Sequence, residues 1–112
     1  MNIRFGETSE IEKFPLFSEE NEGNDIVVAE SDAGEIIGYM QMNEGADDAV
    51  VFFMESTVKG TGSALLNWLK GRCSYIVANN VVATAEGFYA RMGFERAGGN
   101  GYANQFNMAW EA

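Results

Sequence analysis

Residues 59–66 read Lys59-Gly60-Thr61-Gly62-Ser63-Ala64-Leu65-Leu66 and join two segments of different hydrophobic periodicity. Before them, residues 49–54 are apolar without alternation, which predicts a central strand covered on both faces. After them, residues 63–72 carry an apolar stripe at helical spacing, which predicts an amphipathic helix. A helix start presents unpaired N–H groups, and glycines allow a ligand to approach the backbone closely. The stretch therefore predicts a strand–turn–helix unit that binds phosphate, with a plain tight turn as the alternative.

The remaining segments extend this unit into an alternating order of strands and helices. Upstream, we expect strands over residues 2–5, 26–30 and 36–42, and a short helix over 8–17 that Pro15 interrupts. Downstream, we expect a strand over 75–78, a helix from Val81 to Gly93, and strands over 94–97 and 105–110 joined by the glycine-rich residues 98–101. Because a helix connects the strands at 49–54 and 75–78, these two strands should pair in parallel. The prediction is one domain over residues 1–112, of α/β class with an α+β mixed sheet and a central β–α–β crossover.

The composition limits the functions that are open to the chain. Its 112 residues leave room for one domain, and a hydrophobic share of 46% argues for a packed globule. The formal net charge of −10 argues against nucleic-acid binding, because phosphate contacts need a basic face. The absence of histidine removes Ser-His-Asp and Cys-His catalysis and most zinc sites, so we expect no metal.

A single cysteine, Cys73, cannot form an internal disulfide. We expect it to be a small apolar residue near a helix end, with a reactive thiol as the alternative. The first ten residues lack the apolar run of a signal peptide, and no apolar stretch approaches the ~20 residues of a spanning helix. The expectation is a cytoplasmic protein without a membrane partner.

The charges are distributed unequally along the chain. Residues 1–56 carry fourteen acidic and two basic side chains, whereas residues 57–112 carry three acidic and five basic ones. This difference predicts that one half binds an anionic ligand and the other a cationic one. The alternative is that the acidic residues form a solvated face that only keeps the protein soluble.

Two common nucleotide-binding patterns fail at the glycine turn. The chain contains no P-loop string, and Leu65 stands where a dinucleotide loop needs its third glycine. Residues 59–66 instead resemble the acyl-CoA loop of the GNAT N-acetyltransferase superfamily, whose pattern is Q/R-x-x-G-x-G/A. Residues 85–94 resemble the family's second signature, A-x-x-x-Y-x-x-x-G-F, and Ile36-Ile37-Gly38 is similar to its upstream hairpin. The resemblance covers roughly residues 26–96 and implies a GNAT-like acyl-CoA N-acyltransferase fold.

The resemblance also implies where acetyl-CoA, the cosubstrate, would bind. The backbone amides of the loop would hold its pyrophosphate, and these belong to Lys59, Gly60, Thr61, Gly62 and Ser63. The sheet would splay beside the loop, and the pantetheine arm would lie in the gap along the strand end at Phe53, Met54 and Glu55. Tyr89 would protonate the departing thiolate, with a buried core aromatic as its alternative role.

An acceptor amine must lose a proton before it attacks the thioester, because it arrives as an ammonium ion. A carboxylate can take this proton directly or through water, and Glu55 is the first candidate. Glu44, Asp47 and Asp48 are the alternatives, since they stand just before the same strand. Attack would be direct, without a covalent enzyme intermediate, and a strand amide near Met54 could stabilise the oxyanion.

The chain departs from the family pattern at several positions. Thr57 stands at the Q/R position, Val82 replaces a common asparagine, and the front half holds at most one helix where two are typical. The main expectation is an N-acetyltransferase that acetylates a primary amine of a cationic acceptor, either a small amine or a protein lysine; a homodimer stays open. The alternative is a catalytically weak or inactive GNAT-fold module that binds CoA or a partner protein. A third reading is an acidic interaction protein that does not bind CoA.

Overall fold

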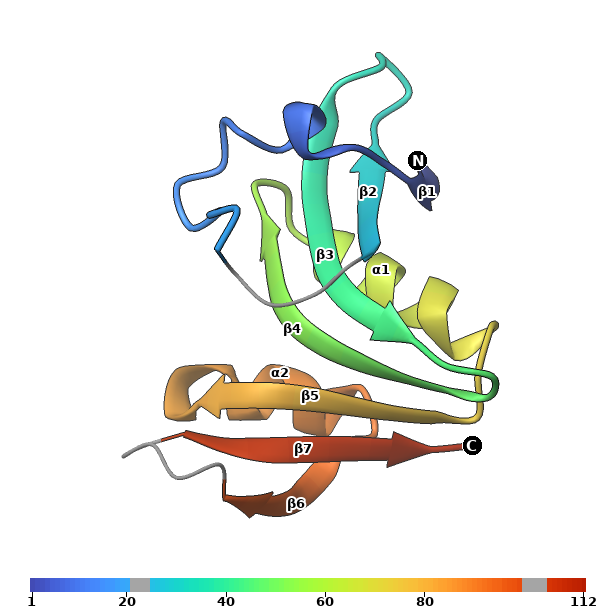
Figure 1. The fold of residues 1–112 in the computed structure, drawn as a ribbon, viewed down its shortest axis with the longest axis vertical. Helices are drawn as coiled ribbons and strands as arrows, with labels where there is room; N and C mark the ends of the chain where they lie inside the picture. Colours follow the sequence, from blue (N-terminus) through green and yellow to red (C-terminus); the bar gives the residue numbers. More distant parts are fainter. Residues whose placement is uncertain (21–24, 100–104) are drawn as a thin grey trace.

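One mixed sheet carries the fold in the computed structural model, which describes residues 1–20, 25–99 and 105–112 (Figure 1). Its strands lie in the order β1-β2-β3-β4-β5-β7-β6. They are β1 (Asn2–Phe5), β2 (Asp25–Glu30), β3 (Ile36–Glu44), β4 (Asp48–Ser56), β5 (Tyr75–Val82), β6 (Glu95–Gly99) and β7 (Gln105–Glu111). The helices are α1 (Thr61–Lys70) and α2 (Glu86–Arg91), with 3-10 turns at Thr8–Glu10 and Ala83–Ala85. The mixed sheet and its crossover confirm the predicted fold class.

The sheet divides between its two central strands. Among the described strands, β4 and β5 form the parallel pair, and they are paired only from Asp48 with Tyr75 to Val51 with Ala78. Beyond this point β4 stays with β3 and β5 stays with β7, so the two strands diverge (Figure 1). A register irregularity lies beside the divergence in both the β3–β4 and the β5–β7 pair. The predicted parallel pair and the gap beside it are therefore both present.

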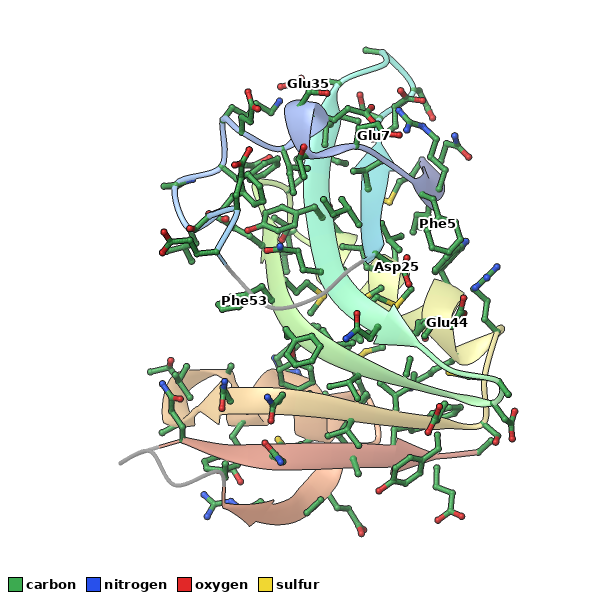
Figure 2. The ribbon with its side chains drawn as sticks, in the orientation of Figure 1. Phe5, Glu7, Asp25, Glu35, Glu44 and Phe53 are labelled. Atoms are coloured by element: carbon green, nitrogen blue, oxygen red, sulfur yellow. The ribbon has the colours of Figure 1, made fainter. Side chains whose placement is uncertain are left out.

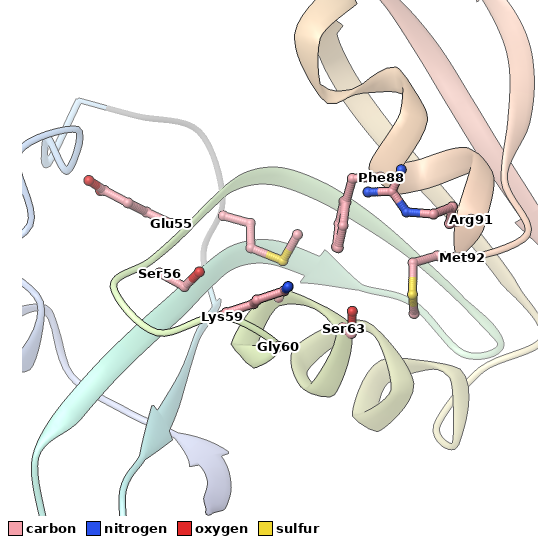
Figure 3. A pocket seen from close by; sticks show the side chains of 10 residues that line it. Glu55, Ser56, Lys59, Gly60, Ser63, Phe88, Arg91 and Met92 are labelled. Carbon is pink, nitrogen blue, oxygen red and sulfur yellow. The ribbon is translucent and has the colours of Figure 1, made fainter.

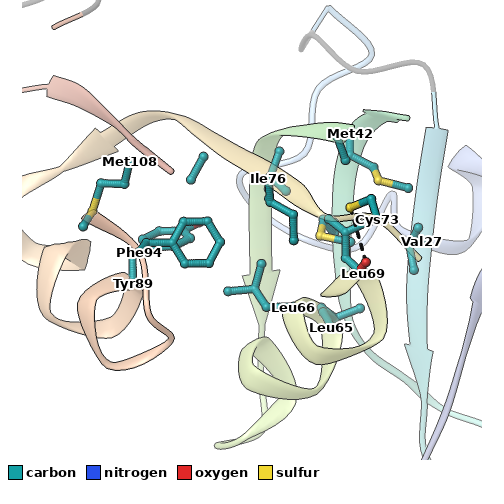
Figure 4. Close-up of a cluster of buried hydrophobic side chains, with 14 of the residues drawn as sticks. Val27, Met42, Leu65, Leu66, Leu69, Cys73, Ile76, Tyr89, Phe94 and Met108 are labelled. Atoms are coloured by element: carbon teal, nitrogen blue, oxygen red, sulfur yellow. Dashed lines mark hydrogen bonds between the residues drawn. The ribbon is translucent and has the colours of Figure 1, made fainter. Parts of the chain in front are cut away.

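Both helices pack on the same face of the sheet. α1 buries Leu65, Leu66 and Leu69 completely, in a cluster with side chains of β2, β3 and β4. α2 contributes Tyr89, which lies with Phe94 in the same buried cluster (Figure 4). Burying one leucine side chain contributes ~2 kcal/mol to the free energy of folding. These contacts hold α1, and with it the turn that precedes α1, firmly against the sheet.

The segment after β1 covers the opposite face of β2 and β3. Ile11 and Phe14 are buried there in a second cluster with Ile26, Val28 and Tyr39. We predicted a short helix over residues 8–17, but regular structure is limited to the 3-10 turn Thr8–Glu10. Pro15 fixes its own φ and lacks an N–H, so a helix does not continue through it. The two buried side chains anchor the segment instead.

The second helix is shorter than predicted. We expected it to start at Val81, but Val81 and Val82 continue β5, where Val81 pairs with Phe106. The side chain of Val81 is buried in the sheet, a position that suits a β-branched residue. α2 then starts at Glu86, and Gly93 adopts the predicted left-handed conformation after its end, with φ of 89°. Of the predicted glycine-rich link, residues 100 and 101 lie outside the described residues.

β4 differs from the predicted strand with cover on both faces. Its burial alternates along the first half of the strand, and Phe53 is 36% exposed. Ala49 and Val51 belong to the core cluster under α1, whereas Phe53 follows a register irregularity and belongs to neither buried cluster. The apolar run therefore reflects one buried face and one face that is open near the strand end.

Candidate functional site

A cavity of about 470 Å³ opens where β4 leaves β5 (Figure 3). Its wall consists of the end of β4, the turn before α1, the first residues of α1, and α2. Five of the residues predicted for the cofactor line it: Met54, Lys59, Gly60, Gly62 and Ser63. Phe53 and Thr61, which we also predicted, are not part of the wall. The other lining residues are Glu55, Ser56, Phe88, Arg91 and Met92.

The turn before α1 leaves backbone donors unpaired at the cavity. Gly60 adopts a left-handed conformation, with φ of 89°, and α1 begins at the next residue. Thr61 donates its N–H to the carbonyl of Val58 over 3.2 Å. The N–H groups of residues 59, 60, 62 and 63 donate to no described residue. Because unpaired N–H groups at a helix start attract anions, this turn can bind a phosphate group.

Gly62 keeps the cavity open on the side of α2. A Cβ atom at this position would lie 3.2 Å from Cζ of Phe88 and 3.7 Å from Cε of Met54. A side chain at this position would therefore require the ring of Phe88 to shift. The close approach of α1 to α2 explains why the turn carries a glycine at this position.

Lys59 and Arg91 are the two cations of the cavity wall. In the described part of the chain, neither forms an ion pair or a side-chain hydrogen bond. The other five basic side chains all have partners. Arg4 pairs with Glu10 and Glu30, Arg72 with Glu44 and Arg96 with Glu86, while Lys70 donates to the carbonyl of Met92 and Lys13 lies over the ring of Phe14. The positive charge that is left for a ligand is thus concentrated at the cavity.

Tyr89 lies directly behind the cavity wall. It is 9% exposed, and its ring contacts those of Phe88 and Phe94, with centroids 5.2 and 5.4 Å away. Burial raises the pKa of its phenol to about 12. The residue that lines the cavity is its neighbour Phe88. The structure shows a core aromatic beside the cavity, and its role as an acid stays a prediction.

Glu55 turns its side chain to the other face of β4. In Figure 3 this side chain points away from Lys59 and Phe88. One carboxylate oxygen, Oε1, accepts a hydrogen bond from the hydroxyl of Tyr39 at 3.1 Å. The backbone N–H of Leu16 donates to both oxygens at 3.3 and 3.4 Å. The carboxylate is therefore fixed on the face that the N-terminal segment covers, next to the splayed end of the sheet.

The alternative carboxylates lie at the opposite end of β4. Asp48 begins the strand, where β4 is still paired with β5. Asp47 accepts a hydrogen bond from the hydroxyl of Ser74, and Glu44 forms an ion pair with Arg72. The cavity wall includes none of these three residues. The structure brings only Glu55 among the four candidates to the splayed end.

Sequence reasoning missed five residues of the site, one of which is Ser56 at the end of β4. Phe88, Arg91 and Met92 lie within the second signature, so their presence on α2 was visible from the sequence. Which of them faces the cavity depends on how a helix of six residues packs, and that pattern is too short to decide it. Tyr39 was missed because its contact with Glu55 depends on the register of β3 against β4.

Cys73 behaves as the predicted small apolar residue. It is buried at the end of α1, and its Sγ lies 3.5 Å from the carbonyl oxygen of Leu69. Burial raises the pKa of its thiol, which lowers its reactivity. Within the described residues, no group of His, Cys, Asp or Glu side chains could hold a metal ion. No helix there is long and apolar enough to cross a membrane.

The sequence matches one family model over most of the region that forms this site. The model described as Acetyltransferase (GNAT) domain matches residues 22–96, which include the turn before α1, the whole of α1 and α2. No curated protein sequence matches the chain.

Solved structures share the fold at low sequence identity. Ard1 from Thermoplasma volcanium has a TM-score of 0.67 at 16% identity, and the match covers 99% of this chain and 97% of that one. The ribosomal-protein-S18-alanine N-acetyltransferase from Escherichia coli has a TM-score of 0.65 at 17% identity, with coverage of 98% and 92%. Tetrahymena GCN5 has a TM-score of 0.61 at 19% identity, with coverage of 78% and 67%. The chain spans only 25% of a similar N-acetylglutamate synthase from Neisseria gonorrhoeae, which was solved with coenzyme A.

Proposed function

The chain belongs to the GNAT acetyltransferase family, and from this premise we propose that it transfers an acetyl group from acetyl-CoA to a primary amine of a cationic acceptor. One observation carries the proposal. A cavity at the splay of β4 and β5 joins unpaired amides at a helix start to the two basic side chains that lack a partner in the described chain.

The residues of the cavity fit an anionic cosubstrate such as acetyl-CoA. The N–H groups of Lys59, Gly60, Gly62 and Ser63 would bind the pyrophosphate, since phosphate groups bind well at helix starts. Lys59 and Arg91 would supply charge-assisted hydrogen bonds to phosphate oxygens. The exposed backbone of β4 beyond Val51, which lacks a β5 partner, would accompany the pantetheine arm. When bound, acetyl-CoA supplies the thioester carbonyl that the amine attacks.

Two side chains would move the protons of the reaction. Tyr89 is protonated at neutral pH, because burial raises the pKa of its phenol to about 12, so it can serve as the acid. Glu55 would accept a proton from the ammonium group of the acceptor. Because its carboxylate lies on the opposite face of β4 from the cavity, the acceptor would enter from that face.

The charge distribution supports a cationic acceptor. The front half of the chain, residues 1–56, carries fourteen acidic and two basic side chains, and it supplies the face on which Glu55 lies. A field of this sign attracts cations to the entrance, and salt screens it. The KM for the acceptor should therefore rise with ionic strength.

Binding and turnover test the proposal in two steps. Acetyl-CoA should raise the melting temperature, because a ligand at 100 times its Kd stabilises the folded state by ~2.7 kcal/mol. Mixing with a panel of primary amines should then release free CoA, and Tyr89→Phe should release much less. If acetyl-CoA leaves the melting temperature unchanged, the proposal is wrong.

A module that binds CoA without turnover is the second candidate. The specific observation in its favour is that Tyr89 lies behind Phe88, without a hydrogen bond from its hydroxyl to any described residue. A thermal shift with acetyl-CoA but no CoA release with any amine would favour this candidate.

Location and assembly remain proposals as well. The lone buried thiol of Cys73 supports a cytoplasmic protein, because an oxidising compartment would add no internal disulfide. We also propose that residues 1–112 form one domain and that the chain can form a homodimer. Cell fractionation and sedimentation equilibrium test these points.

A further inference from the structure

The carboxylate of Glu55 is held in place but retains the capacity to bind another donor. Two of its three hydrogen-bond contacts go to Oε1, from the hydroxyl of Tyr39 at 3.1 Å and from the N–H of Leu16 at 3.3 Å. The other oxygen, Oε2, receives only the longer 3.4 Å contact from Leu16. A carboxylate has about four acceptor positions, so Oε2 can accept from a further donor. No cation of the described chain pairs with Glu55.

Two exposed apolar side chains flank this carboxylate. Leu16, whose N–H donates to Glu55, leaves 68% of its surface exposed. Phe53 is 36% exposed and stands two residues before Glu55 in β4 (Figure 2). Both residues lie beyond the register irregularity of β4, where Phe53 pairs with Gln41 and Glu55 with Tyr39, so they share a face at a spacing of ~7 Å. A negative charge thus lies on the same part of the surface as two apolar side chains that the described chain leaves partly uncovered.

We propose that Glu55, Leu16 and Phe53 form the acceptor subsite, and that the acceptor is a primary ammonium ion with an apolar arm, alkyl or aryl, rather than a polycation. The inference rests on the proposed acetyl transfer and narrows its substrate class. The ammonium group would donate to Oε2 of Glu55, and the arm would cover Phe53 and the side chain of Leu16. Burying this apolar surface would add to the affinity that the charge provides.

The transfer balances with these residues. The ammonium loses one proton to the carboxylate of Glu55, and the amine nitrogen forms a bond to the acetyl carbon while the bond from that carbon to sulfur breaks. The nitrogen loses its second proton through water as the tetrahedral intermediate collapses, and the departing sulfur takes the proton of the Tyr89 hydroxyl. The second nitrogen proton restores the Tyr89 hydroxyl, and the proton that Glu55 accepted passes to solvent. The products are an N-substituted acetamide and free CoA.

Tyr39 is a positioning residue in this arrangement. It is fully buried, and both burial and the carboxylate of Glu55 raise the pKa of its phenol far above the ordinary value. Its hydroxyl therefore stays a donor to Glu55 at every pH at which the enzyme would work. Tyr39→Phe should raise the KM for the acceptor about fivefold, with the KM for acetyl-CoA unchanged. A purely structural role would alter both constants.

The first test compares phenethylamine, ethanolamine and spermidine as acceptors. We expect kcat/KM for phenethylamine to exceed that for ethanolamine and for spermidine at least tenfold. Phe53→Ala should bring the ratio of kcat/KM for phenethylamine to kcat/KM for ethanolamine close to one. A general loss of activity would lower both values equally and leave this ratio unchanged. Tyr75→Ala is the matched control, since Tyr75 is 38% exposed but lies at the other end of the sheet, and the ratio should survive there. A preference for spermidine, or a ratio that Phe53→Ala leaves intact, overturns the inference.

A second test measures acceptor binding without turnover. In an NMR titration of the protein saturated with CoA, the amide resonance of Leu16 should shift at lower concentrations of phenethylamine than of ethanolamine. Glu55→Gln should weaken the binding of both amines. Equal response to the two amines, or no effect of Glu55→Gln, overturns the subsite. If no amine releases CoA from acetyl-CoA, the proposed function fails, while this measurement still decides the subsite.

Discussion

Lys59 and Arg91 stand on two different elements of one cavity wall, the turn before α1 and the helix α2, and neither has an ion-pair partner in the described chain. The remaining basic side chains all contact a carboxylate, a carbonyl or an aromatic ring. In a chain with a net charge of −10, two unpaired cations at one cavity indicate an anionic ligand there.

The first prediction concerns these two cations. Lys59→Ala and Arg91→Ala should each weaken acetyl-CoA binding about tenfold, which corresponds to about 1.4 kcal/mol, because each removes a charge-assisted contact to phosphate. Titration calorimetry at two salt concentrations checks this, and each variant should show a smaller salt dependence. Lys13→Ala is the control, because it changes the net charge equally at the N-terminal segment. Equal weakening in all three variants would show a general charge effect instead.

The second prediction concerns the acid role of Tyr89. Tyr89→Phe should lower kcat about 100-fold and leave the Kd for acetyl-CoA unchanged. Because burial raises the pKa of this phenol to about 12, the proton is present throughout pH 6–10, so the loss should be constant over that range. Stopped assays of CoA release at each pH measure it, with Tyr75→Phe as the control. Full activity of Tyr89→Phe would falsify the acid role.

The sequence was sufficient to predict the strand, the glycine turn and α1, because these depend on local periodicity. Leu65 and Leu69 are separated by one helical turn, and both are fully buried. The prediction failed where a tertiary contact overrides a local pattern. Val81 has helical spacing to Ala85, yet it lies in β5, since its pairing with Phe106 and its burial in the sheet decide its conformation.

In the candidate site, too, features that depend on neighbouring residues were predictable from the sequence, and contacts between distant residues were not. The amides at Gly60, Gly62 and Ser63 belong to the turn itself, and they donate to no described residue; their role in binding phosphate stays a prediction. The contact of Tyr39 with Glu55 joins residues that are sixteen positions apart. It depends on a strand register that contains an irregularity between Gln41 and Met42, and no local pattern encodes such a shift.

The third prediction concerns the backbone of the turn. Gly60→Ala should lower the free energy of unfolding by about 1 kcal/mol, because Gly60 has φ of 89° and an L-residue is strained there. A Cβ atom at this position would meet no heavy atom within 4 Å, so the cost arises from conformation alone. Gly60→Asn should cost less, since asparagine tolerates the left-handed region. Urea titration of the three proteins measures the difference, and an equal loss in both variants would contradict the prediction.

The fourth prediction concerns acid stability and the ion pair of Glu10 with Arg4. The two side chains approach to 2.7 Å, and the hydrogen bond from Arg4 is the main cause that lowers the pKa of Glu10 to about 2. A carboxyl whose folded pKa lies below its unfolded value near 4.3 stabilises the protein above that value. This stability is lost as the pH falls from about 4.5 towards about 2.

Glu10→Gln should therefore melt below the wild type at pH 7, and the two melting temperatures should converge as the pH falls towards about 2. Melting curves at half-unit intervals measure this convergence. Glu12→Gln is the matched control, because Glu12 lies in the same exposed segment and forms no ion pair among the described residues. A difference between wild type and Glu10→Gln that stays constant down to pH 2 would mean that packing, and not the charge of Glu10, stabilises this segment.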